Sequence, residues 1–226
     1  ISEESLNLTN VETNCKHPTA HRFVVCLQME YCSGGDLSQI IRNKEVHYST
    51  PEGKARVLDY FRQIVQGVAW IHKHNIIHGD LKPGNILREK ETMKIGDFGL
   101  ARKSFEMKSN VLGTVGYAAP EILTCHYDMS IDVYSLGVIL YEMCLSPSTR
   151  SEFIVAVDAL RTRRSINPIV ETNYQVFTAL IKEMTESDPA RRPTIEEVHR
   201  RLAVLDGELR RIERFSPAFV DATNLW

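Results

Sequence analysis

The sequence predicts one mainly α-helical domain with a single strand near its start and one small hairpin. Three observations predict this fold: apolar residues recur every three or four positions in several segments, residues 131–145 are almost wholly apolar, and β-branched runs are short and few. The chain of 226 residues is long enough for one sizeable core, and its 43% hydrophobic and 25% charged residues are ordinary for a globular protein.

The first elements are a polar segment and a strand. Residues 1–21 carry few large apolar groups, which is typical of a loop or of the tail of an insertion. The stretch "HRFVVCLQMEYC" (21–32) changes to β-branched and apolar residues and predicts a buried strand. "SGGD" (33–36) ends it, and a short helix can follow Asp36.

The middle of the chain predicts a long helix and then the hairpin. Thr50 and Pro51 supply a cap and a first-turn proline. The apolar positions that follow form one helical stripe: Val57, Phe61, Ile64, Val68 and Ile71. "NILRE" and "MKIGD" flank the polar "KET" and predict two short antiparallel strands.

From Ser130 onward the pattern is helical. "DVYSLGVILYEMCL" is apolar on nearly every side, which predicts a central buried helix. Amphipathic helices are expected near 151–161 and 174–185. A last helix should begin at Thr194, where Thr194 and Glu197 form a capping box.

Composition and charge exclude several classes of protein. The net charge of −2 offers no general basic field for nucleic acid or anionic lipid, and the basic clusters at 161–164 and 200–214 are interpreted as solvated helix faces. No apolar run approaches the roughly 18 residues of a membrane-spanning helix. The first residue is Ile1, so the sequence is interpreted as part of a longer chain, and no signal peptide is present.

The cysteines indicate reduced thiols and a cytoplasmic location, because they are odd in number and widely scattered. They are Cys15, Cys26, Cys32, Cys125 and Cys144. The segment 15–26 contains cysteines and histidines, but not at the spacing of a zinc site.

The segments "HGDLKPGNIL" (78–87) and "GDFG" (96–99) carry the chemistry. Transfer of a phosphoryl group needs a base near the acceptor hydroxyl, magnesium ligands and cations against the phosphates. Asp80, Lys82, Asn85 and Asp97 supply these groups in the order and spacing of protein-kinase motifs. From residue 22 to about 205 the chain resembles the hinge strand and C-terminal lobe of a eukaryotic protein kinase.

That resemblance implies a mainly α, kinase-like C-lobe with a hinge strand and a small β-hairpin, which is α+β in the complete kinase domain. It implies the following division: 1–21 tail of a polar insertion, 22–36 hinge strand and linker, 37–206 C-lobe, and 207–226 C-terminal extension. Asp80 would accept the proton of the substrate hydroxyl, and Lys82 would neutralise the γ-phosphate. Asn85 and Asp97 would each hold Mg²⁺, with Phe98 packed behind them.

The resemblance also implies an ATP site. Met29 would be the gatekeeper, and Glu30 and Cys32 would offer backbone groups to the purine. Asp36 would reach the ribose, and Leu87 would form an apolar floor.

Further residues of the resemblance are structural or concern the acceptor. Glu121 of "AAPE" would pair with Arg192, and Asp132 would hydrogen-bond the backbone of the catalytic loop. Lys82 two residues after the base, and Thr114 after Gly113, resemble serine/threonine kinases rather than tyrosine kinases.

Gly79 departs from the pattern, which has an arginine between the histidine and the aspartate. That arginine clamps an activation-segment phosphate by charge-assisted bonds, so this route of phospho-control is expected to be absent or re-routed while the base survives. The glycine-rich loop, the β-strand lysine and its glutamate partner are not found in these 226 residues. Little activity is therefore expected from this segment alone.

The segment "YEMCLSPSTRSEFIVAVDALR" (141–161) and the polar insertion before the hinge resemble the kinases of the α subunit of translation initiation factor 2, which act in translational stress control. The resemblance implies that the α subunit of this factor is the substrate, docked on a helix that begins near Thr149 and includes Glu152 and Phe153. For Phe153 the alternative of an inward-facing core aromatic stays open. The resemblance also implies regulatory phosphorylation at Thr114 and Ser109. No nucleic acid or membrane partner is expected from this segment, and dimerisation would use regions outside it.

Two alternatives stay open. The hinge "MEYCxGGDL" also resembles NIMA-related kinases, another serine/threonine group. A catalytically inactive, kinase-like interaction module is the alternative from a different class of function.

Overall fold

The computed structural model describes residues 28–103, 116–124 and 127–214, and it divides the chain into two units, 1–31 and 32–226. In the first unit only residues 28–31 are described. They have no regular secondary structure, and the side chains of Met29 and Tyr31 are exposed. Most of the predicted strand at 21–32 therefore lies outside the described residues, as do Ser109 and Thr114.

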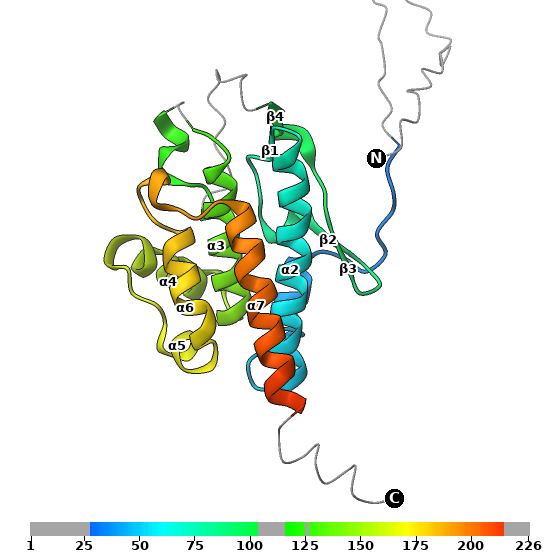
Figure 1. Ribbon diagram of the computed structural model, residues 1–226, viewed down its shortest axis with the longest axis vertical. Helices are drawn as coiled ribbons and strands as arrows, with labels where there is room; N and C mark the ends of the chain where they lie inside the picture. The colour runs from blue at the N-terminus through cyan, green and yellow to red at the C-terminus, as the bar shows by residue number, and fades with distance from the viewer. Residues whose placement is uncertain (1–27, 104–115, 125–126, 215–226) are drawn as a thin grey trace, which may run out of the picture. The chain divides into compact units, whose positions relative to one another are not determined.

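The second unit is built mainly of helices (Figure 1). The α-helices are α1 (Leu37–Arg42), α2 (Pro51–Lys73), α3 (Ser130–Leu145), α4 (Arg150–Arg163), α5 (Pro168–Asn173), α6 (Gln175–Met184) and α7 (Ile195–Arg214). Short 3-10 turns lie at Pro83–Asn85, Phe98–Leu100, Pro120–Thr124 and Pro189–Arg191. The mainly helical prediction is confirmed.

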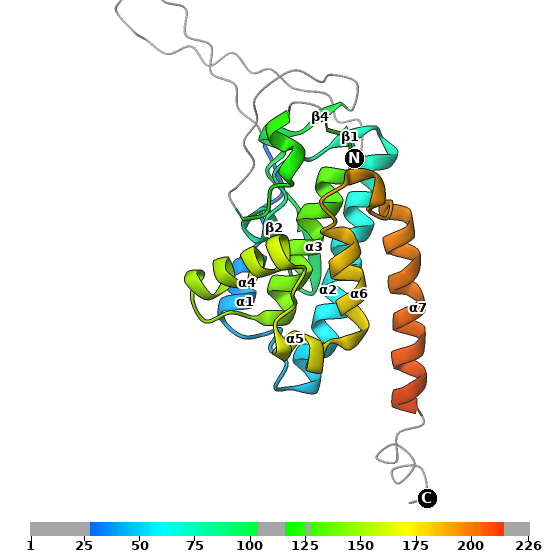
Figure 2. The ribbon, with the colours of Figure 1, turned by 90° about the vertical axis from the view of Figure 1, so that its left-hand side faces the viewer.

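Helix α3 forms the centre of this unit, as its apolar sequence predicts. Every residue from Ile131 to Leu145 is buried. Helices α2 and α6 pack against α3, and α7 runs beside α2 (Figure 2). At Gly137 a Cβ atom would lie only 2.8 Å from side-chain atoms of Met184 and Thr185, so the absence of a side chain allows α3 and α6 to approach closely.

Helix α2 begins as predicted. The Thr50 hydroxyl accepts a hydrogen bond from the backbone N–H of Gly53, and Pro51 occupies the first helical position. The predicted stripe faces the core, because all five of its apolar residues are buried. Burial of this stripe, rather than helix propensity alone, stabilises a helix of this length.

Two small antiparallel sheets contact α2. Strands β2 (Ile86–Glu89) and β3 (Thr92–Ile95) form the predicted hairpin, with Ile86 opposite Ile95. The sequence did not predict the second pairing, in which β1 (Ile76–Ile77) meets β4 (Arg102–Lys103). Two-residue strands are too short to give a periodic pattern.

The helical region has further details that the sequence did not predict. Helix α5 was missed, although Asn167 caps it and Pro168 occupies its first position. The capping box before α7 is half formed: Thr194 accepts the N–H of Glu197 at 3.3 Å, whereas the Glu197 carboxylate binds Arg200 and Arg201. Helix α7 continues to Arg214, and the division of the chain at residue 206 stays a prediction. None of the helices within the described ranges is both long and apolar enough to cross a bilayer.

Candidate active site

The loop between β1 and the 3-10 turn at Pro83–Asn85 is held by one carboxylate from α3. Asp132, which is fully buried, accepts the backbone N–H of His78 at 2.8 Å and that of Gly79 at 2.9 Å. Its Oδ2 also lies 2.8 Å from Nε2 of His72 on α2. The predicted bond from Asp132 to the catalytic-loop backbone is confirmed. Because these hydrogen bonds satisfy the buried carboxylate, it can serve as an anchor.

His78 fixes the other side of the same loop. Its Nδ1 accepts the backbone N–H of Asp80 at 3.3 Å, so the ring proton is on Nε2, which donates to the carbonyl of Gly96 at 3.0 Å. The ring lies 5.2 Å from that of Phe98, centroid to centroid. His78 therefore connects the Asp80 loop to the segment that carries Asp97.

The three predicted catalytic residues lie together. Lys82 donates to Asp80 Oδ2 at 2.6 Å, and the Asn85 amide donates to the backbone carbonyl of Asp80 at 2.9 Å and to Oδ2 at 3.3 Å. Asn85 is buried, whereas Asp80 and Lys82 are partly exposed. These bonds orient the Asp80 carboxylate at the surface of the lobe.

Asp97 lies next to this group through the hairpin. The N–H of Gly96 donates to the carbonyl of Asn85 at 2.9 Å, and Asp97 follows Gly96. Asp97 has a left-handed backbone with φ of 57° and accepts the N–H of Gly99. Such a φ is uncommon outside glycine but is tolerated by aspartate, and strain of this kind is often found at functional sites.

The oxygen donors of this group fit a magnesium ion. The Asn85 amide nitrogen faces Asp80, which turns its oxygen away, and the Asp97 carboxylate is exposed. Mg²⁺ prefers such hard oxygen ligands and takes few of them from the protein when phosphates supply others. Among the described residues, no three His, Cys, Asp or Glu side chains converge as a self-contained metal site.

Two residues of the predicted nucleotide site are adjacent. Asp36 and Leu87 face each other in an isolated antiparallel bridge, and the N–H of Arg88 donates to the carbonyl of Gly35 at 2.8 Å. Asp36 also caps α1 by accepting the N–H of Gln39 at 2.9 Å. This bridge places the predicted ribose and purine-floor positions together. Met29 and Glu30 belong to the other unit, so their roles stay predictions, as does that of Cys32.

Gly79 has a backbone reason to be glycine. Its φ is +78°, which L-residues with a side chain adopt at a cost. A Cβ there would meet only the carbonyl of Leu100, at 3.4 Å, so space does not forbid a side chain. Gly79 thus removes a guanidinium and also provides a backbone conformation that its sequence context does not predict.

The predicted ion pair between Glu121 and Arg192 is confirmed. The guanidinium binds both carboxylate oxygens, with the Nη2–Oε2 distance at 2.9 Å, and it also donates to the carbonyl of Ser130 at 3.1 Å. Arg192 lies over the Tyr134 ring, 4.8 Å from its centroid. This pair fixes the 3-10 turn at Pro120–Thr124 to the start of α3.

A second polar cluster joins α3, α4 and Tyr117. The Tyr117 hydroxyl donates to Glu142 Oε2 at 2.6 Å and accepts from Arg150 at 3.2 Å. Burial raises the pKa of Glu142 to about 7, although the bond from Tyr117 and the charge of Arg150 oppose the shift. Burial, followed by the Glu142 charge, raises the pKa of Tyr117. No sequence pattern indicates this cluster, because its members are far apart along the chain.

Two of the three predicted docking residues cap helix α4. The Thr149 hydroxyl accepts the N–H of Glu152 at 3.1 Å, and the Glu152 carboxylate accepts the N–H of Ser148 at 2.8 Å. The two bonds cap the first turn, but they do not form a strict capping box, because Glu152 binds the N–H of Ser148 rather than that of the N-cap residue Thr149. Both side chains are nevertheless exposed.

Of the two alternatives for Phe153, a docking contact or core packing, the structure shows core packing. Phe153 is only 1% exposed; its ring lies 5.3 Å from that of Tyr117 and beneath the Arg150 guanidinium. The helix turns this position toward the core, so the aromatic side chain serves packing. The apolar residues that α4 does expose are Ile154 (53%) and Val155 (66%).

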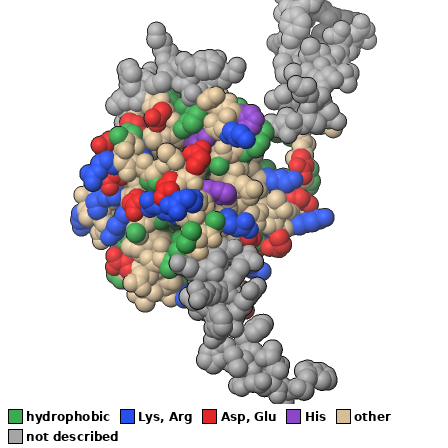
Figure 3. Space-filling view, in the orientation of Figure 1, with side chains coloured by type: hydrophobic (Ala, Val, Ile, Leu, Met, Phe, Trp, Pro, Cys, Tyr) green, Lys and Arg blue, Asp and Glu red, His purple; other side chains and the backbone are tan. Residues whose placement is uncertain are grey.

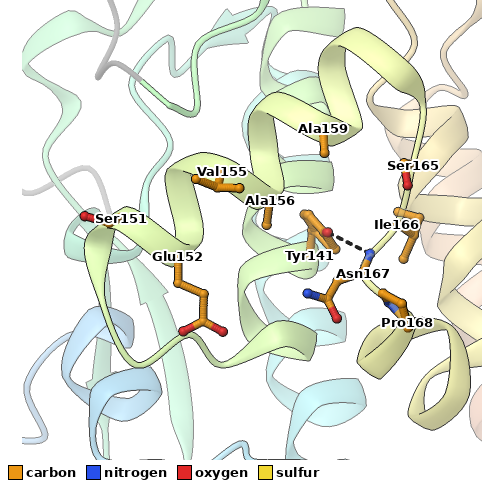
Figure 4. A pocket seen from close by; sticks show the side chains of 10 residues that line it. All are labelled: Tyr141, Ser151, Glu152, Val155, Ala156, Ala159, Ser165, Ile166, Asn167 and Pro168. Atoms are coloured by element: carbon orange, nitrogen blue, oxygen red, sulfur yellow. Dashed lines mark hydrogen bonds between the residues drawn. The ribbon is translucent and has the colours of Figure 1, made fainter.

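Beside this face lies a hollow of about 440 Å³ between α4 and the segment that leads into α5 (Figure 4). Its lining is mostly apolar, with Val155, Ala156 and Ala159 from α4 and Pro168 opposite them. Tyr141 forms part of the hollow and accepts the backbone N–H of Asn167 at 3.0 Å. On the face in Figure 3, acidic and basic side chains are interspersed, so no single-sign patch is present on that face.

Comparison with known proteins gives a consistent result. The protein kinase domain family model matches residues 6–202. The interferon-induced, double-stranded RNA-activated protein kinase of Mus musculus is 37% identical over 78% of this chain and 34% of its own length. The eIF-2-alpha kinase GCN2 of Schizosaccharomyces pombe is 36% identical over 76% of this chain but only 12% of its own length.

A relative from another group is also similar. The serine/threonine-protein kinase Nek3 of Oryza sativa subsp. japonica is 32% identical over 77% of this chain and 30% of its own length. The chain thus spans well under half of each of these three relatives. Since the family model covers most of the chain and agrees with the arrangement of Asp80, Lys82, Asn85 and Asp97, the chain belongs to the protein kinase family.

Proposed function

We propose that this chain is the acceptor-binding lobe of a protein serine/threonine kinase that transfers phosphate from ATP to a protein hydroxyl. The observation that carries the proposal is the convergence of Lys82 and Asn85 on the Asp80 carboxylate. A carboxylate held in this way can orient an acceptor hydroxyl and take its proton.

Each group has a stated task in this reaction. Asp80 accepts the proton as the hydroxyl oxygen attacks the γ-phosphate, and Lys82 places a positive charge beside the developing negative charge. Asn85 and Asp97 would hold Mg²⁺, which supplies charge neutralisation on the nucleotide phosphates when bound. Asp36 and Leu87 would contact the nucleoside. Cytoplasmic action remains a prediction from the scattered cysteines.

The test is phosphate transfer by the full-length protein that contains this chain. Asp80→Asn and Asp97→Asn should each lower the rate by at least about a hundredfold, because a base or a metal ligand is lost. Asp59→Asn is the matched control: Asp59 binds only Arg62 and Gln63 on its own helix and should tolerate the change. Near-normal transfer in either site variant would refute the assignment.

The proposed substrate is the α subunit of translation initiation factor 2. Its support is the similarity to GCN2 of Schizosaccharomyces pombe, an eIF-2-alpha kinase, together with the α4 segment of the sequence. Because Phe153 is buried, the docking surface on α4 is revised to Ile154 and Val155, with Glu152 at its edge. Binding at a distance from the base can position an acceptor without altering the chemistry.

Two substrates separate docking from catalysis. Val155→Asp should lower kcat/KM on the factor about tenfold and leave that on a short serine peptide within twofold. Val176→Asp on α6, also at an exposed valine, is the control and should change neither rate. Transfer to the peptide but not to the factor by the unaltered protein would favour the NIMA-related alternative. No transfer to any substrate would favour the interaction module.

A further inference from the structure

Arg161, near the end of α4, makes contacts that its basic sequence context did not predict. The cluster "RTRR" (161–164) was interpreted as a solvated face, but Arg161 is half-buried. Its Nη2 donates to the backbone carbonyl of Gly116 at 2.8 Å and to that of Ala118 at 3.0 Å. Its Nε donates to the hydroxyl of Tyr134 at 2.9 Å.

The carbonyl between these two is held from the opposite side. The Ser135 hydroxyl on α3 donates to the carbonyl of Tyr117 at 3.0 Å. Three consecutive carbonyls of the segment 116–118 are therefore bound by side chains, two by Arg161 and one by Ser135. An irregular segment has no ladder to satisfy its backbone, so these side chains determine its path.

The same part of α3 supports the proposed base. Asp132 lies three residues before Ser135, on the same side of the helix, and holds the backbone of His78 and Gly79 just before Asp80. The segment 116–118 and the Asp80 loop are thus attached to neighbouring positions of one rigid, buried helix. A shift of the segment on α3 would change its register relative to Asp80.

Tyr134 extends this connection to the ion pair. Two guanidinium groups lie over its buried ring, with the Arg161 carbon 5.6 Å and the Arg192 carbon 4.8 Å from the ring centroid. Arg192 in turn binds Glu121. A planar, stacked guanidinium with a forked set of donors suits this position, and an ammonium group does not reproduce it.

We propose that Arg161 is a positioning residue: it fixes the segment 116–118 against α3 and so aligns a protein acceptor with Asp80. This inference rests on the proposed kinase function, but the anchoring of 116–118 by Arg161 can be measured without an activity assay. It also gives α4 a second task beyond docking, because the helix that would bind the substrate also holds the segment 116–118 directly.

The experiment compares Arg161→Lys with Arg164→Lys in the full-length protein. Arg164 is a matched control, since it also donates to two backbone carbonyls, those of Lys182 and Thr185, and to the carboxylate of Glu186, but it does not contact 116–118. The measurements are hydrogen–deuterium exchange of peptides that cover residues 116–122, melting temperature, and kcat and KM for the acceptor and for ATP.

For Arg161→Lys we expect faster exchange across 116–122 and a fall in acceptor kcat/KM of about tenfold to a hundredfold, with the KM for ATP changed less than twofold. Arg164→Lys should lower the melting temperature about as much as Arg161→Lys does. It should change neither the exchange across 116–122 nor the acceptor kcat/KM. Tyr134→Phe removes only the hydroxyl and should cause a smaller change in the same direction as Arg161→Lys.

Equal effects of the two arginine variants on exchange and on acceptor kcat/KM would overturn the proposal, because Arg161 would then be an ordinary structural residue. Unchanged exchange across 116–122 in Arg161→Lys would overturn it as well. A complete lack of phosphate transfer by the unaltered protein would instead refute the proposed function, and the exchange comparison would still decide whether Arg161 anchors the segment.

Discussion

The backbone N–H of Gly79 donates to Oδ1 of Asp132 at 2.9 Å, while Gly79 itself has a φ of +78°. The residue immediately before the proposed base is therefore held in a conformation that glycine adopts without strain. Gly79, at a position where the kinase resemblance predicts an arginine, therefore offers no phosphate-binding cation and has a relaxed backbone.

Gly79→Ala should lower the free energy of unfolding by about 1–2 kcal/mol, because a Cβ disfavours this φ. Gly84→Ala, five residues later, is the control: a Cβ there meets nothing within 4 Å, and the change should be neutral or slightly stabilising. Urea denaturation of both variants makes the comparison. Equal stability of the two would show that strain at Gly79 is not the relevant factor.

Asp132→Asn should destabilise the fold by about 3 kcal/mol or more, and it should impair phosphate transfer in the molecules that remain folded. In the variant an amide NH2 group replaces one carboxylate oxygen. This group then faces another hydrogen-bond donor: either the backbone N–H of Gly79, or the His72 ring N–H and the backbone N–H of His78. Denaturation gives the first effect and the rate per folded molecule gives the second. A stable variant with unchanged turnover would contradict the anchoring role.

Phe153→Ala should lower the free energy of unfolding by about 3–5 kcal/mol, since it leaves a cavity beneath Tyr117 and Arg150. Val155→Ala, two residues on and 66% exposed, should change it by less than about 0.5 kcal/mol. The two melting curves distinguish a core residue from a surface residue on the same helix. Similar curves would be incompatible with the burial of Phe153.

The stability of the protein should carry a component from Glu142 that falls as pH rises. The folded pKa is about 7 against a reference of 4.5, so between these values the folded state binds more protons than the unfolded state. The free energy of unfolding therefore decreases from pH 4.5 to about 7, by on the order of 3 kcal/mol for this group.

Glu142→Gln should remove this component while keeping an acceptor for Tyr117. The difference in the free energy of unfolding, variant minus unaltered protein, should therefore be more positive at pH 7.5 than at pH 5.5. Urea denaturation at both pH values measures the difference. Glu196→Gln, on the exposed side of α7, serves as the control and should show no such gain. A gain of the same size at both pH values would indicate that titration of Glu142 is not responsible.

Local patterns were sufficient for the long elements and for the proposed catalytic group. The stripe on α2 and the apolar run of α3 predict buried helices because periodicity over many residues averages out local exceptions. Asp80, Lys82 and Asn85 lie within six residues, and the hairpin brings Asp97 beside them. Their convergence follows from short-range chain geometry.

Contacts between distant elements could not be predicted in the same way. Arg161 was assigned to solvent because a basic cluster carries no information about the carbonyls that it will meet, and those of Gly116 and Ala118 lie more than forty positions earlier. Phe153 was predicted as a docking residue from the family resemblance, with core packing left open, because the sequence of α4 does not decide which side of the helix faces inward. Tertiary packing determines where the side chains of Arg161 and Phe153 lie.

The close approach of α3 and α6 at Gly137 has a consequence for inherited variation. Any larger residue would force the two helices apart in the middle of the core, at a point that contacts neither the proposed base nor the acceptor segment. In a cell, quality-control proteases would degrade the destabilised molecules, while the catalytic step itself would be unchanged. The substitution would appear as a shortage of protein molecules, each of which, once folded, would work at its normal rate.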